Sequence, residues 1–342
     1  MRYRRGVAAP GPALTVAVTG PTGTFGFGFV PLLEADDRVG RIIGIARRPF
    51  DPSEHGWTKM EYRQGDVRDP AALEQAFVGA DVVVHLAFMI VGIADRQTIR
   101  EINVEGTMNT FRAAVAAGAR RFVYASSVAA YGFGRDNPVG ITEEWPTRPA
   151  KHFFYSKEKA ELERLLHDAA AAHPEIDMYL LRPSIVLGPH FAGAKTFFPT
   201  WLEALGQRLT AFALRPPVTL PALLPALPVQ FIHEQDVGQA LHLCVQAAGP
   251  PGAYNVTADG VLTALDVARE IGMLPVAVPR APVQVAGRLL AALPFAPPVL
   301  GWAEALWTPP IMDAGKAKRE LGWSPRYTAL EALRETLEAQ RG

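Results

Sequence analysis

Short apolar runs alternate with longer segments of mixed polarity through the first half of the chain. Each of the apolar runs has the length of a buried strand: 14–19, 41–46, 60–65, 81–87, 121–127 and 178–182. Three of the segments between them have helical patterns: 70–77, 96–117 and 156–172. Strands that alternate with helices predict an α/β fold, with a parallel sheet covered by helices on both faces. Right-handed crossovers would give this sheet the doubly wound order of a Rossmann domain.

The pattern changes after residue 184, where prolines and glycines become frequent. Prolines crowd the stretch 215–228, which excludes a regular helix there. Two strand-like and three helical segments share this half of the chain: 229–233, 253–256, 234–247, 283–293 and 329–340. The broken pattern predicts a second, smaller lobe that is built from separated segments.

These patterns divide the chain into two predicted parts. Residues 13–184 form the Rossmann domain, and segment 229–256 returns to it. Residues 185–228 and 257–342 form the smaller C-terminal substrate-binding lobe, and residues 1–12 are a flexible leader.

Composition restricts the compartment and the partners. Of the 342 residues 49% are hydrophobic and 20% are charged, as expected for a globular chain. A net charge of +0 argues against nucleic acid or an acidic membrane surface as a partner. The single cysteine, Cys244, excludes an intramolecular disulfide and favours a reducing, cytoplasmic location. The apolar stretch 283–307 is interrupted by prolines, so we expect it to pack over a cleft or a partner rather than to enter a membrane.

A glycine-rich turn follows the first predicted strand and precedes a segment of helical length. Its glycines are spaced G-x-x-G-x-x-G, which differs from the usual G-x-G-x-x-G of dinucleotide sites. Strand, glycine turn and helix together present backbone N–H groups and a positive helix end to a phosphate. We expect this turn to bind the pyrophosphate of a dinucleotide through Gly20, Thr22, Gly23, Thr24, Phe25 and Gly26. The alternative is a turn that binds nothing.

The ends of the next strands predict the type of dinucleotide. Arg47 and Arg48 stand where an NAD enzyme often has an acid, and two guanidiniums suit a 2′-phosphate. NADP is therefore favoured over NAD, although the two arginines could simply be solvated. After the third strand come Asp66 and Val67, where the carboxylate could accept from the adenine amino group or cap the next turn. The backbone at Leu86 and Ala87, after the fourth strand, would line the cofactor.

Tyr155 and Lys159 are the main candidates for chemistry. They are four residues apart, so they lie on one face of a helix. A nearby ammonium would lower the pKa of the phenol from about 10 toward neutral pH and make it an acid–base group. Ser127, at the end of the fifth strand, could hold a substrate oxygen beside it. The histidines lack the spacing of metal ligands, so no metal site is expected.

Motifs along nearly the whole chain resemble the extended short-chain dehydrogenase/reductases, the NAD-dependent epimerase/dehydratase family. They include TGPTGTFG (19–26), NVEGT (103–107), YASSVAAYG (124–132), YSKEK (155–159), LRPSIVLGP (181–189) and ELGWSPRY (320–327). The resemblance implies that Tyr155 is the acid–base residue, Lys159 its partner, Ser127 the oxygen-orienting hydroxyl and Asn103 a supporting residue. It also implies that Phe88, Ala125, Pro183 and Ile185 border the cofactor, and that Asp236 anchors the returning segment.

Two departures from the family pattern bear on the substrate. Val128, Ala129 and Ala130 follow Ser127 where the dehydratases of this family have an acidic pair, so dehydration is disfavoured. Aromatic and apolar residues stand at positions that could face the lobe, and an apolar cleft fits a nucleotide sugar poorly. The residues expected to contact the substrate are Met89, Ser127, Phe154 and Phe197. The alternative is that these aromatic residues belong to the ordinary core.

The sequence therefore predicts an NADP-preferring oxidoreductase that transfers hydride between nicotinamide and a carbonyl or secondary alcohol of a largely apolar small molecule. One alternative is a nucleotide-sugar epimerase, which would keep its cofactor through each cycle. Another is a non-catalytic sensor that uses dinucleotide binding to control a partner. A homodimer is expected because helices 96–117 and 156–172 resemble the usual pairing surface of the family.

Overall fold

The computed structural model describes residues 13–90, 95–150, 153–191, 221–280 and 308–341. The predicted leader 1–12, the predicted helix 283–293 and the candidate substrate residue Phe197 lie outside these residues.

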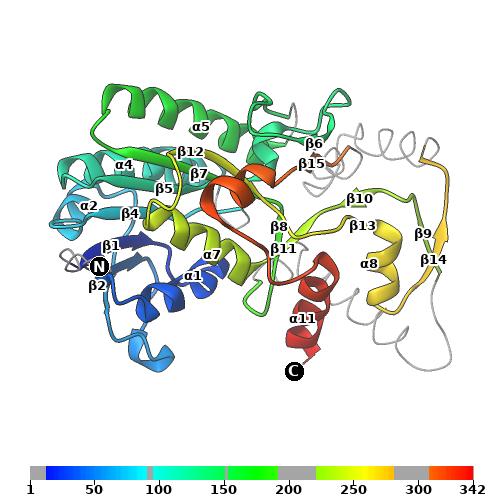
Figure 1. Ribbon diagram of the computed structural model, residues 1–342, viewed down its shortest axis with the longest axis horizontal. Coiled ribbons are helices and arrows are strands. Elements are labelled where there is room, and N and C mark those ends of the chain that lie inside the picture. Colours follow the sequence, from blue (N-terminus) through cyan, green and yellow to red (C-terminus); the bar gives the residue numbers. More distant parts are fainter. Residues whose placement is uncertain (1–12, 91–94, 151–152, 192–220, 281–307, 342) are drawn as a thin grey trace, which may run out of the picture.

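Seven parallel strands form the central sheet (Figure 1). They are β1 (Leu14–Thr19), β2 (Val39–Ala46), β3 (Met60–Gln64), β4 (Val82–His85), β5 (Arg121–Ala125), β7 (Asp177–Pro183) and β12 (Gly252–Val256). Their order is β12-β7-β5-β4-β1-β2-β3, so the chain steps outward in one direction from β1 and then in the other from β4. This doubly wound order confirms the predicted Rossmann fold. In sheets of this kind ligands bind beyond the ends of the strands where the order reverses, which here are β1 and β4.

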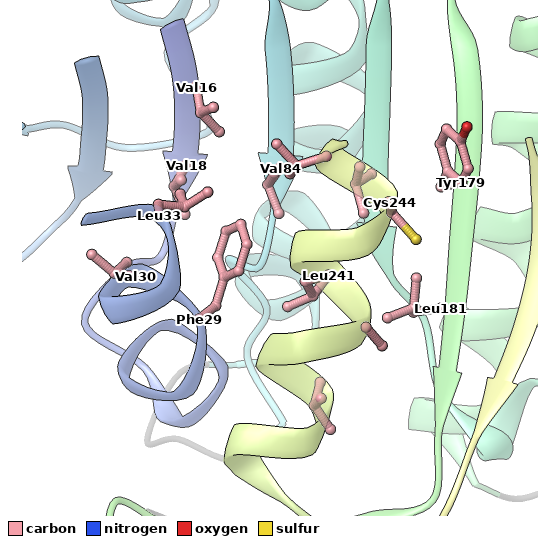
Figure 2. Packing of buried hydrophobic residues seen from close by; sticks show 14 of the residues in the cluster. Val16, Val18, Phe29, Val30, Leu33, Val84, Tyr179, Leu181, Leu241 and Cys244 are labelled. Atoms are coloured by element: carbon pink, nitrogen blue, oxygen red, sulfur yellow. The ribbon is translucent and has the colours of Figure 1, made fainter. Parts of the chain in front are cut away.

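Helices cover both faces of the sheet. On one face lie α1 (Thr24–Ala35) and α7 (Glu234–Val245), and on the other lie α2 (Pro70–Ala76), α4 (Gly106–Ala116) and α5 (Phe154–Ala172) (Figure 1). Successive strand residues point to opposite faces, so Val16 and Val18 pack with Phe29 of α1, whereas Ala17 belongs to the other cluster (Figure 2). A strand buried on both faces reads as a continuous apolar run, which is why the sequence located these strands.

Helices α1 and α7 approach each other through two glycines. A Cβ on Gly238 would lie 2.0 Å from the Gly28 carbonyl oxygen, and a Cβ on Gly28 would lie 2.2 Å from that of Glu234. Only glycine permits this backbone contact. It holds the returning segment directly against the helix that follows the glycine-rich turn.

The predicted helix 96–117 is divided in three. It consists of α3 (Arg96–Arg100), a π-helical turn (Glu101–Glu105) and α4. The side chain of Asn103 leaves this turn to bond the backbone of Met89, and the Thr107 hydroxyl donates to the Asn103 carbonyl at 2.5 Å. A π-helical turn lies inside an otherwise continuous helical segment, so the coarse sequence pattern did not reveal the break.

The rest of the described chain forms short paired strands and helices. The strand pairs are β8 (Ile185–Leu187) with β11 (Phe231–His233), β9 (Pro221–Leu224) with β14 (Leu274–Ala277), β10 (Pro228–Val229) with β13 (Leu262–Thr263), and β6 (Val139–Ile141) with β15 (Ile311–Met312). The remaining helices and helical turns are η1 (Pro52–His55), η3 (Val128–Tyr131), α8 (Ala264–Glu270), η6 (Ala317–Leu321) and α11 (Ala329–Arg341). The predicted strand 229–233 is thus two strands, separated by Gln230, whose side chain bonds the Met312 backbone. The division of the chain at residue 184 stays a prediction.

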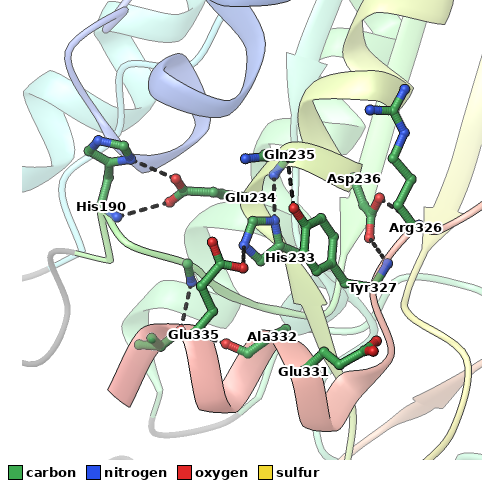
Figure 3. A network of polar contacts seen from close by, with 12 residues as sticks. His190, His233, Glu234, Gln235, Asp236, Arg326, Tyr327, Glu331, Ala332 and Glu335 are labelled. Atoms are coloured by element: carbon green, nitrogen blue, oxygen red, sulfur yellow. Dashed lines mark hydrogen bonds and ion pairs between the residues drawn. The ribbon is translucent and has the colours of Figure 1, made fainter. Parts of the chain in front are cut away.

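The N-terminus of α7 anchors the C-terminal segments (Figure 3). The carboxylate of Asp236 accepts from the backbone N–H groups of Arg326 at 2.8 Å and Tyr327 at 3.2 Å. The Tyr327 ring stacks on His233 with 3.9 Å between centroids. The expected anchoring role of Asp236 is confirmed by these bonds. No helix in the described ranges is long and apolar enough to cross a membrane.

Candidate active site

The glycine-rich turn has the shape of a phosphate cradle. Gly20 has a φ of +71°, and a Cβ there would lie 2.9 Å from the Ala87 backbone. A Cβ on Gly26 would lie 2.0 Å from the Pro21 carbonyl oxygen, whereas a Cβ on Gly23 would lie 3.5 Å from the nearest atom of the described residues outside its two chain neighbours, the Gly20 carbonyl oxygen. Gly23 is exposed and caps the N-terminus of α1. The turn therefore fits a dinucleotide pyrophosphate, because it leaves space at Gly23 and aims a helix N-terminus at it.

Other residues of the turn have protein partners. The Thr24 hydroxyl donates to the His190 carbonyl at 2.8 Å, and Phe25 packs against the core cluster that contains α1. The His190 ring bonds the Glu234 carboxylate at 2.6 Å (Figure 3). The same ring stacks on Phe27, with 4.2 Å between centroids. Residue 190 thus touches the glycine-rich turn and the first turn of α1, a contact that the sequence did not indicate. Thr22 is half-buried and stays a predicted cofactor residue.

Arg47 and Arg48 lie at the end of β2, and both are exposed. Gln64 donates to the Arg47 carbonyl at 3.0 Å, and the Tyr62 hydroxyl donates to the Arg48 carbonyl. These bonds fix the backbone of Arg47 and Arg48, while the two guanidinium side chains are exposed to solvent. In the part of the chain that the structure describes, neither guanidinium forms an ion pair.

Asp66 and Val67 follow β3 as predicted. The Asp66 carboxylate forms a bidentate pair with Arg68, at 3.1 and 2.7 Å, and accepts from the Arg68 backbone N–H. The hydrogen bonds from Arg68 lower the pKa of Asp66. The sequence allows two roles for Asp66. The structure shows the carboxylate bonding within its own turn, to the Arg68 N–H, and the contact with adenine stays a prediction. Val67 packs against Gly106 at the start of α4.

Asn103 fixes the chain that follows β4. Its Oδ1 accepts from the Met89 N–H at 2.7 Å, and its Nδ2 donates to the Met89 carbonyl at 2.9 Å. The same Nδ2 donates to the buried Glu158 carboxylate at 2.7 Å. Asn103 therefore holds the backbone at Met89, directly after Leu86, Ala87 and Phe88, and its role in the site stays a prediction.

His85 connects Thr19, the last residue of β1 before the glycine-rich turn, to Thr107 of α4. Thr107 donates to the Asn103 carbonyl, so it must accept from the Nε2–H of His85 at 2.9 Å. The other ring nitrogen, Nδ1, then accepts from the Thr19 hydroxyl at 2.6 Å. Burial lowers the pKa of His85 to about 3, and the charge of Lys159 adds to this, so the ring stays neutral in this chain of bonds.

Tyr155 and Ser127 meet at the end of β5. The Ser127 side chain acts on the Tyr155 phenol and lowers its pKa, and Ser127 Oγ accepts from the Ala129 N–H at 3.1 Å. The proton of Ser127 is therefore left for Tyr155 or for a substrate oxygen. Burial raises the pKa of Tyr155 to about 12, and Ser127 offsets part of this rise.

Lys159 points to the same end of the sheet. Its Nζ donates to the Ala125 carbonyl at 2.7 Å and to the Tyr124 hydroxyl at 3.1 Å, and it lies 3.7 Å from the centroid of the Phe88 ring. Burial lowers the pKa of Lys159 to about 7, although the carboxylates of Glu163 and Glu158 oppose this change. The third N–H of the ammonium remains for another acceptor.

The expected lowering of the Tyr155 pKa by Lys159 was wrong for this form of the protein. The ammonium is drawn toward Tyr124, Ala125 and Phe88, and it lies 5.9 Å from the centroid of the Tyr155 ring. Desolvation of the phenol therefore outweighs the distant charge.

Aromatic rings surround Tyr155. The Phe88 ring lies edge-on at 5.6 Å, and the Phe153 ring lies at 5.8 Å and packs in turn against Phe133. Phe154 lies under the Arg96 guanidinium, 3.7 Å away, so its contact with a substrate stays a prediction. Pro183 is buried at the end of β7, whereas Ile185 is 46% exposed.

Three buried residues around this site were missing from the sequence prediction: Tyr124, Glu163 and Arg182. Glu163 follows the candidate Lys159 by four residues on one helix, so its position shares a face with that candidate. Tyr124 lies on β5 directly before the candidate Ala125, so the two side chains point to opposite faces. The pairing of Arg182 with Glu163 depends on the tertiary fold, which no local pattern gives.

Comparison with known proteins places the chain in a family. The model of the NAD dependent epimerase/dehydratase family matches residues 16–257. The chain belongs to this family. It is 28% identical to the uncharacterized protein y4nG of Sinorhizobium fredii over 335 residues, which are 94% of this chain and 77% of that protein.

Two relatives have named activities. Identity is 26% over 299 residues with the 3beta-hydroxysteroid-dehydrogenase/decarboxylase isoform 1 of Arabidopsis thaliana, covering 82% of this chain and 67% of that protein. The chain is 30% identical over 204 residues to sterol demethylase protein B of Methylococcus capsulatus, and the match covers 58% of this chain and 60% of that protein. The solved structure of UDP-glucose 4-epimerase from Thermotoga maritima shares the fold, with a TM-score of 0.71, 17% identity and coverage of 96% and 99%.

Proposed function

We propose that this member of the family is an NADP-preferring oxidoreductase that acts on a carbonyl or secondary alcohol of a largely apolar molecule. The observation that supports it best is that Ser127, Tyr155 and Lys159 come together at the ligand-binding end of the sheet, where Ser127 acts on the Tyr155 phenol and Lys159 Nζ lies 5.9 Å from the centroid of its ring. Nicotinamide, when bound, would supply or accept the hydride.

The protein groups then have separate tasks. Tyr155 is protonated at neutral pH and can donate that proton to the oxygen of a reduced carbonyl. Ser127 shares the charge on the same oxygen through its free proton. Lys159, with two of its three donors bonded to protein, uses the third for the cofactor ribose. Asn103 keeps the backbone at Met89 in place.

The substrate class is inferred from the walls of the site. Phe88 and Phe153 place aromatic rings on Tyr155, and the buried Ala129 and Ala130 follow Ser127, so no carboxylate is available there for dehydration. Two relatives are named for reactions of steroids or sterols, which are polycyclic and apolar. We therefore infer an apolar, ring-containing alcohol or ketone as the substrate.

A substrate panel tests this proposal. Purified protein is incubated with NADP or NAD and with 3-hydroxysteroids, 3-ketosteroids, small aliphatic ketones and UDP-sugars, and nicotinamide absorbance is followed. Turnover of the steroids is the expected result. Tightly held NAD together with conversion of a UDP-sugar would establish an epimerase instead, and cofactor binding without any turnover would indicate a sensor.

The preference for NADP is tested at the end of β2. Replacement of both Arg47 and Arg48 by Ala is expected to weaken NADP binding about 10- to 100-fold, since hydrogen bonds to charged groups contribute about 1.5–3 kcal/mol. Binding of NAD, which lacks the 2′-phosphate, should not change. The control is Arg112→Ala, which removes an exposed arginine from α4. Equal losses for both cofactors, measured by fluorescence titration, would contradict the prediction.

A homodimer through the exposed sides of helices α4 and α5 stays a prediction.

A further inference from the structure

Three side chains at successive turns of α5 lie on one stripe of the helix. Tyr155, Lys159 and Glu163 are separated by four residues each, and the first two belong to the proposed active site. Glu163 is 4% exposed and lies behind them. A carboxylate is rarely buried to this extent without a compensating partner.

That partner is Arg182 of β7. Its Nε lies 3.0 and 3.1 Å from the two carboxylate oxygens of Glu163, and its Nη2 lies 2.5 Å from one of them. The side chain of Arg182 is 7% exposed. Because Arg182 directly precedes Pro183, the pair joins α5 to the end of β7, where the nicotinamide is expected.

Ser126 brings a third element to the same carboxylate. Its buried hydroxyl donates to Oε1 of Glu163 at 2.5 Å, and it directly precedes Ser127. One carboxylate therefore contacts residues at the ends of β5 and β7, and it is itself on the helix of Tyr155 and Lys159.

The other side of the guanidinium is also held. Nη1 of Arg182 donates to the Tyr131 hydroxyl at 2.7 Å, and that hydroxyl donates to Asn255 Oδ1 of β12 at 2.8 Å. Burying an ion pair costs about as much as the attraction returns, so apolar residues of the same volume would stabilise the fold equally well. Unlike apolar residues, Glu163 and Arg182 form hydrogen bonds with fixed directions, which hold the elements that they join in one arrangement.

We propose that Glu163 and Arg182 are positioning residues, which hold Ser127 and the end of β7 at fixed places relative to Tyr155 and Lys159. Neither residue touches the substrate in this scheme. The inference rests on the proposed function, because it assumes that Ser127 and Tyr155 do the chemistry.

The charge of Glu163 also acts on Lys159. It raises the pKa of this amine against the effect of burial, as does Glu158 on the same helix. From the strands, Tyr124 of β5 faces the amine with a neutral hydroxyl, and His85 of β4 is a neutral ring. The positive charge of Arg182 is balanced by Glu163 itself. Removal of the Glu163 charge therefore lowers the Lys159 pKa, and the ammonium is lost at a lower pH.

The first test removes one bond and no charge. Ser126→Ala is expected to lower kcat about tenfold to 100-fold, because a displacement of about 1 Å in a site has effects of this size. The KM for the cofactor should stay within the error of the wild-type value. The matched control is Thr110→Val, which deletes a buried hydroxyl bonded to the Gly106 carbonyl at 2.7 Å in α4. Equal kcat values for the two variants would overturn the proposal.

The second test separates charge from shape. Glu163→Gln keeps an acceptor for Ser126 but removes the negative charge that raises the pKa of Lys159. Lys159 should therefore lose its proton at a lower pH, and the fall in activity with rising pH should begin at a lower pH than in the wild type. An unchanged pH profile would remove the electrostatic part of the proposal.

The third test separates positioning from stability. The double variant Glu163→Leu with Arg182→Met replaces the pair by apolar residues, so its thermal unfolding temperature should lie close to that of the wild type while kcat stays low. Full activity in this stable variant would show that the pair has only a structural role.

The failure of this proposal can be told from failure of the proposed function. If Tyr155→Phe remains fully active, the site itself is wrong. If Tyr155→Phe is inactive while Ser126→Ala matches Thr110→Val, the site is right and only the positioning role is lost.

Discussion

Tyr155→Phe is expected to lower kcat about 100- to 10,000-fold, which is the usual contribution of a positioned acid–base group. Phenylalanine keeps the ring in its contacts with Phe88 and Phe153, but it removes the proton and the hydroxyl on which Ser127 acts. Cofactor affinity should not change, because the proposed contacts to the cofactor are made mainly by the glycine-rich turn and Lys159. Steady-state kinetics and a fluorescence titration with NADP measure the two quantities.

The control for this variant is Tyr179→Phe. The Tyr179 hydroxyl also belongs to a buried ring, but it donates to the Gly249 carbonyl at 2.9 Å, at the opposite end of β7 from Pro183. Its loss should cost only the net contribution of a hydrogen bond, about 0.5–1.5 kcal/mol of stability, and leave kcat unchanged. If Tyr155→Phe and Tyr179→Phe have similar kcat values, Tyr155 is not the acid–base residue.

The phenol and the amine of this site have opposite shifts with one cause. Burial penalises whichever form is charged, so it raises the pKa of Tyr155 to about 12 and lowers that of Lys159 to about 7. At neutral pH the phenol therefore holds its proton, as a proton donor must. Tyr155 can therefore donate its proton during carbonyl reduction without any change in this arrangement. Alcohol oxidation needs the deprotonated phenol, so a positive charge would have to come nearer to Tyr155 than the amine of Lys159, which lies 5.9 Å from the ring centroid.

The sequence was sufficient to locate the strands of the central sheet. Buried parallel strands are continuous apolar runs, and β1 begins and ends at the predicted residues. The ends of such strands meet at one edge of the sheet, so the strand pattern predicts that Ser127 lies at the edge where ligands bind. It does not place Tyr155, which lies in the first turn of α5.

Contacts that cross elements could not be predicted in this way. Spacing places Lys159 on the face of Tyr155, but the direction of its ammonium depends on Tyr124 and Phe88, which come from other elements. The π-helical turn at Asn103 is similarly determined by the backbone of Met89, fourteen residues earlier. Local periodicity contains neither fact.

The glycine-rich turn gives a second prediction of large effect, in which two neighbouring glycines differ. Gly26→Ala would place its Cβ 2.0 Å from the Pro21 carbonyl oxygen, so the turn or α1 must move. We expect a loss of about 1–3 kcal/mol of stability, the usual cost of overpacking, together with loss of measurable cofactor binding. Thermal unfolding and fluorescence titration with NADP test both expectations.

Gly23→Ala is the matched variant. Its Cβ would lie 3.5 Å from the nearest atom of the described residues outside its two chain neighbours, and the φ of −95° suits alanine, so the fold should keep its stability. The added methyl would instead occupy the space left at the cap of α1, where the pyrophosphate is expected, and NADP affinity should fall about tenfold or more, as it does when a ligand group loses one charge-assisted hydrogen bond. Stable protein with unchanged affinity would mean that the phosphates do not approach Gly23. Since the turn, the arginines after β2 and Lys159 are all assigned to one bound dinucleotide, that result would require the cofactor to be placed elsewhere along the edge of the sheet.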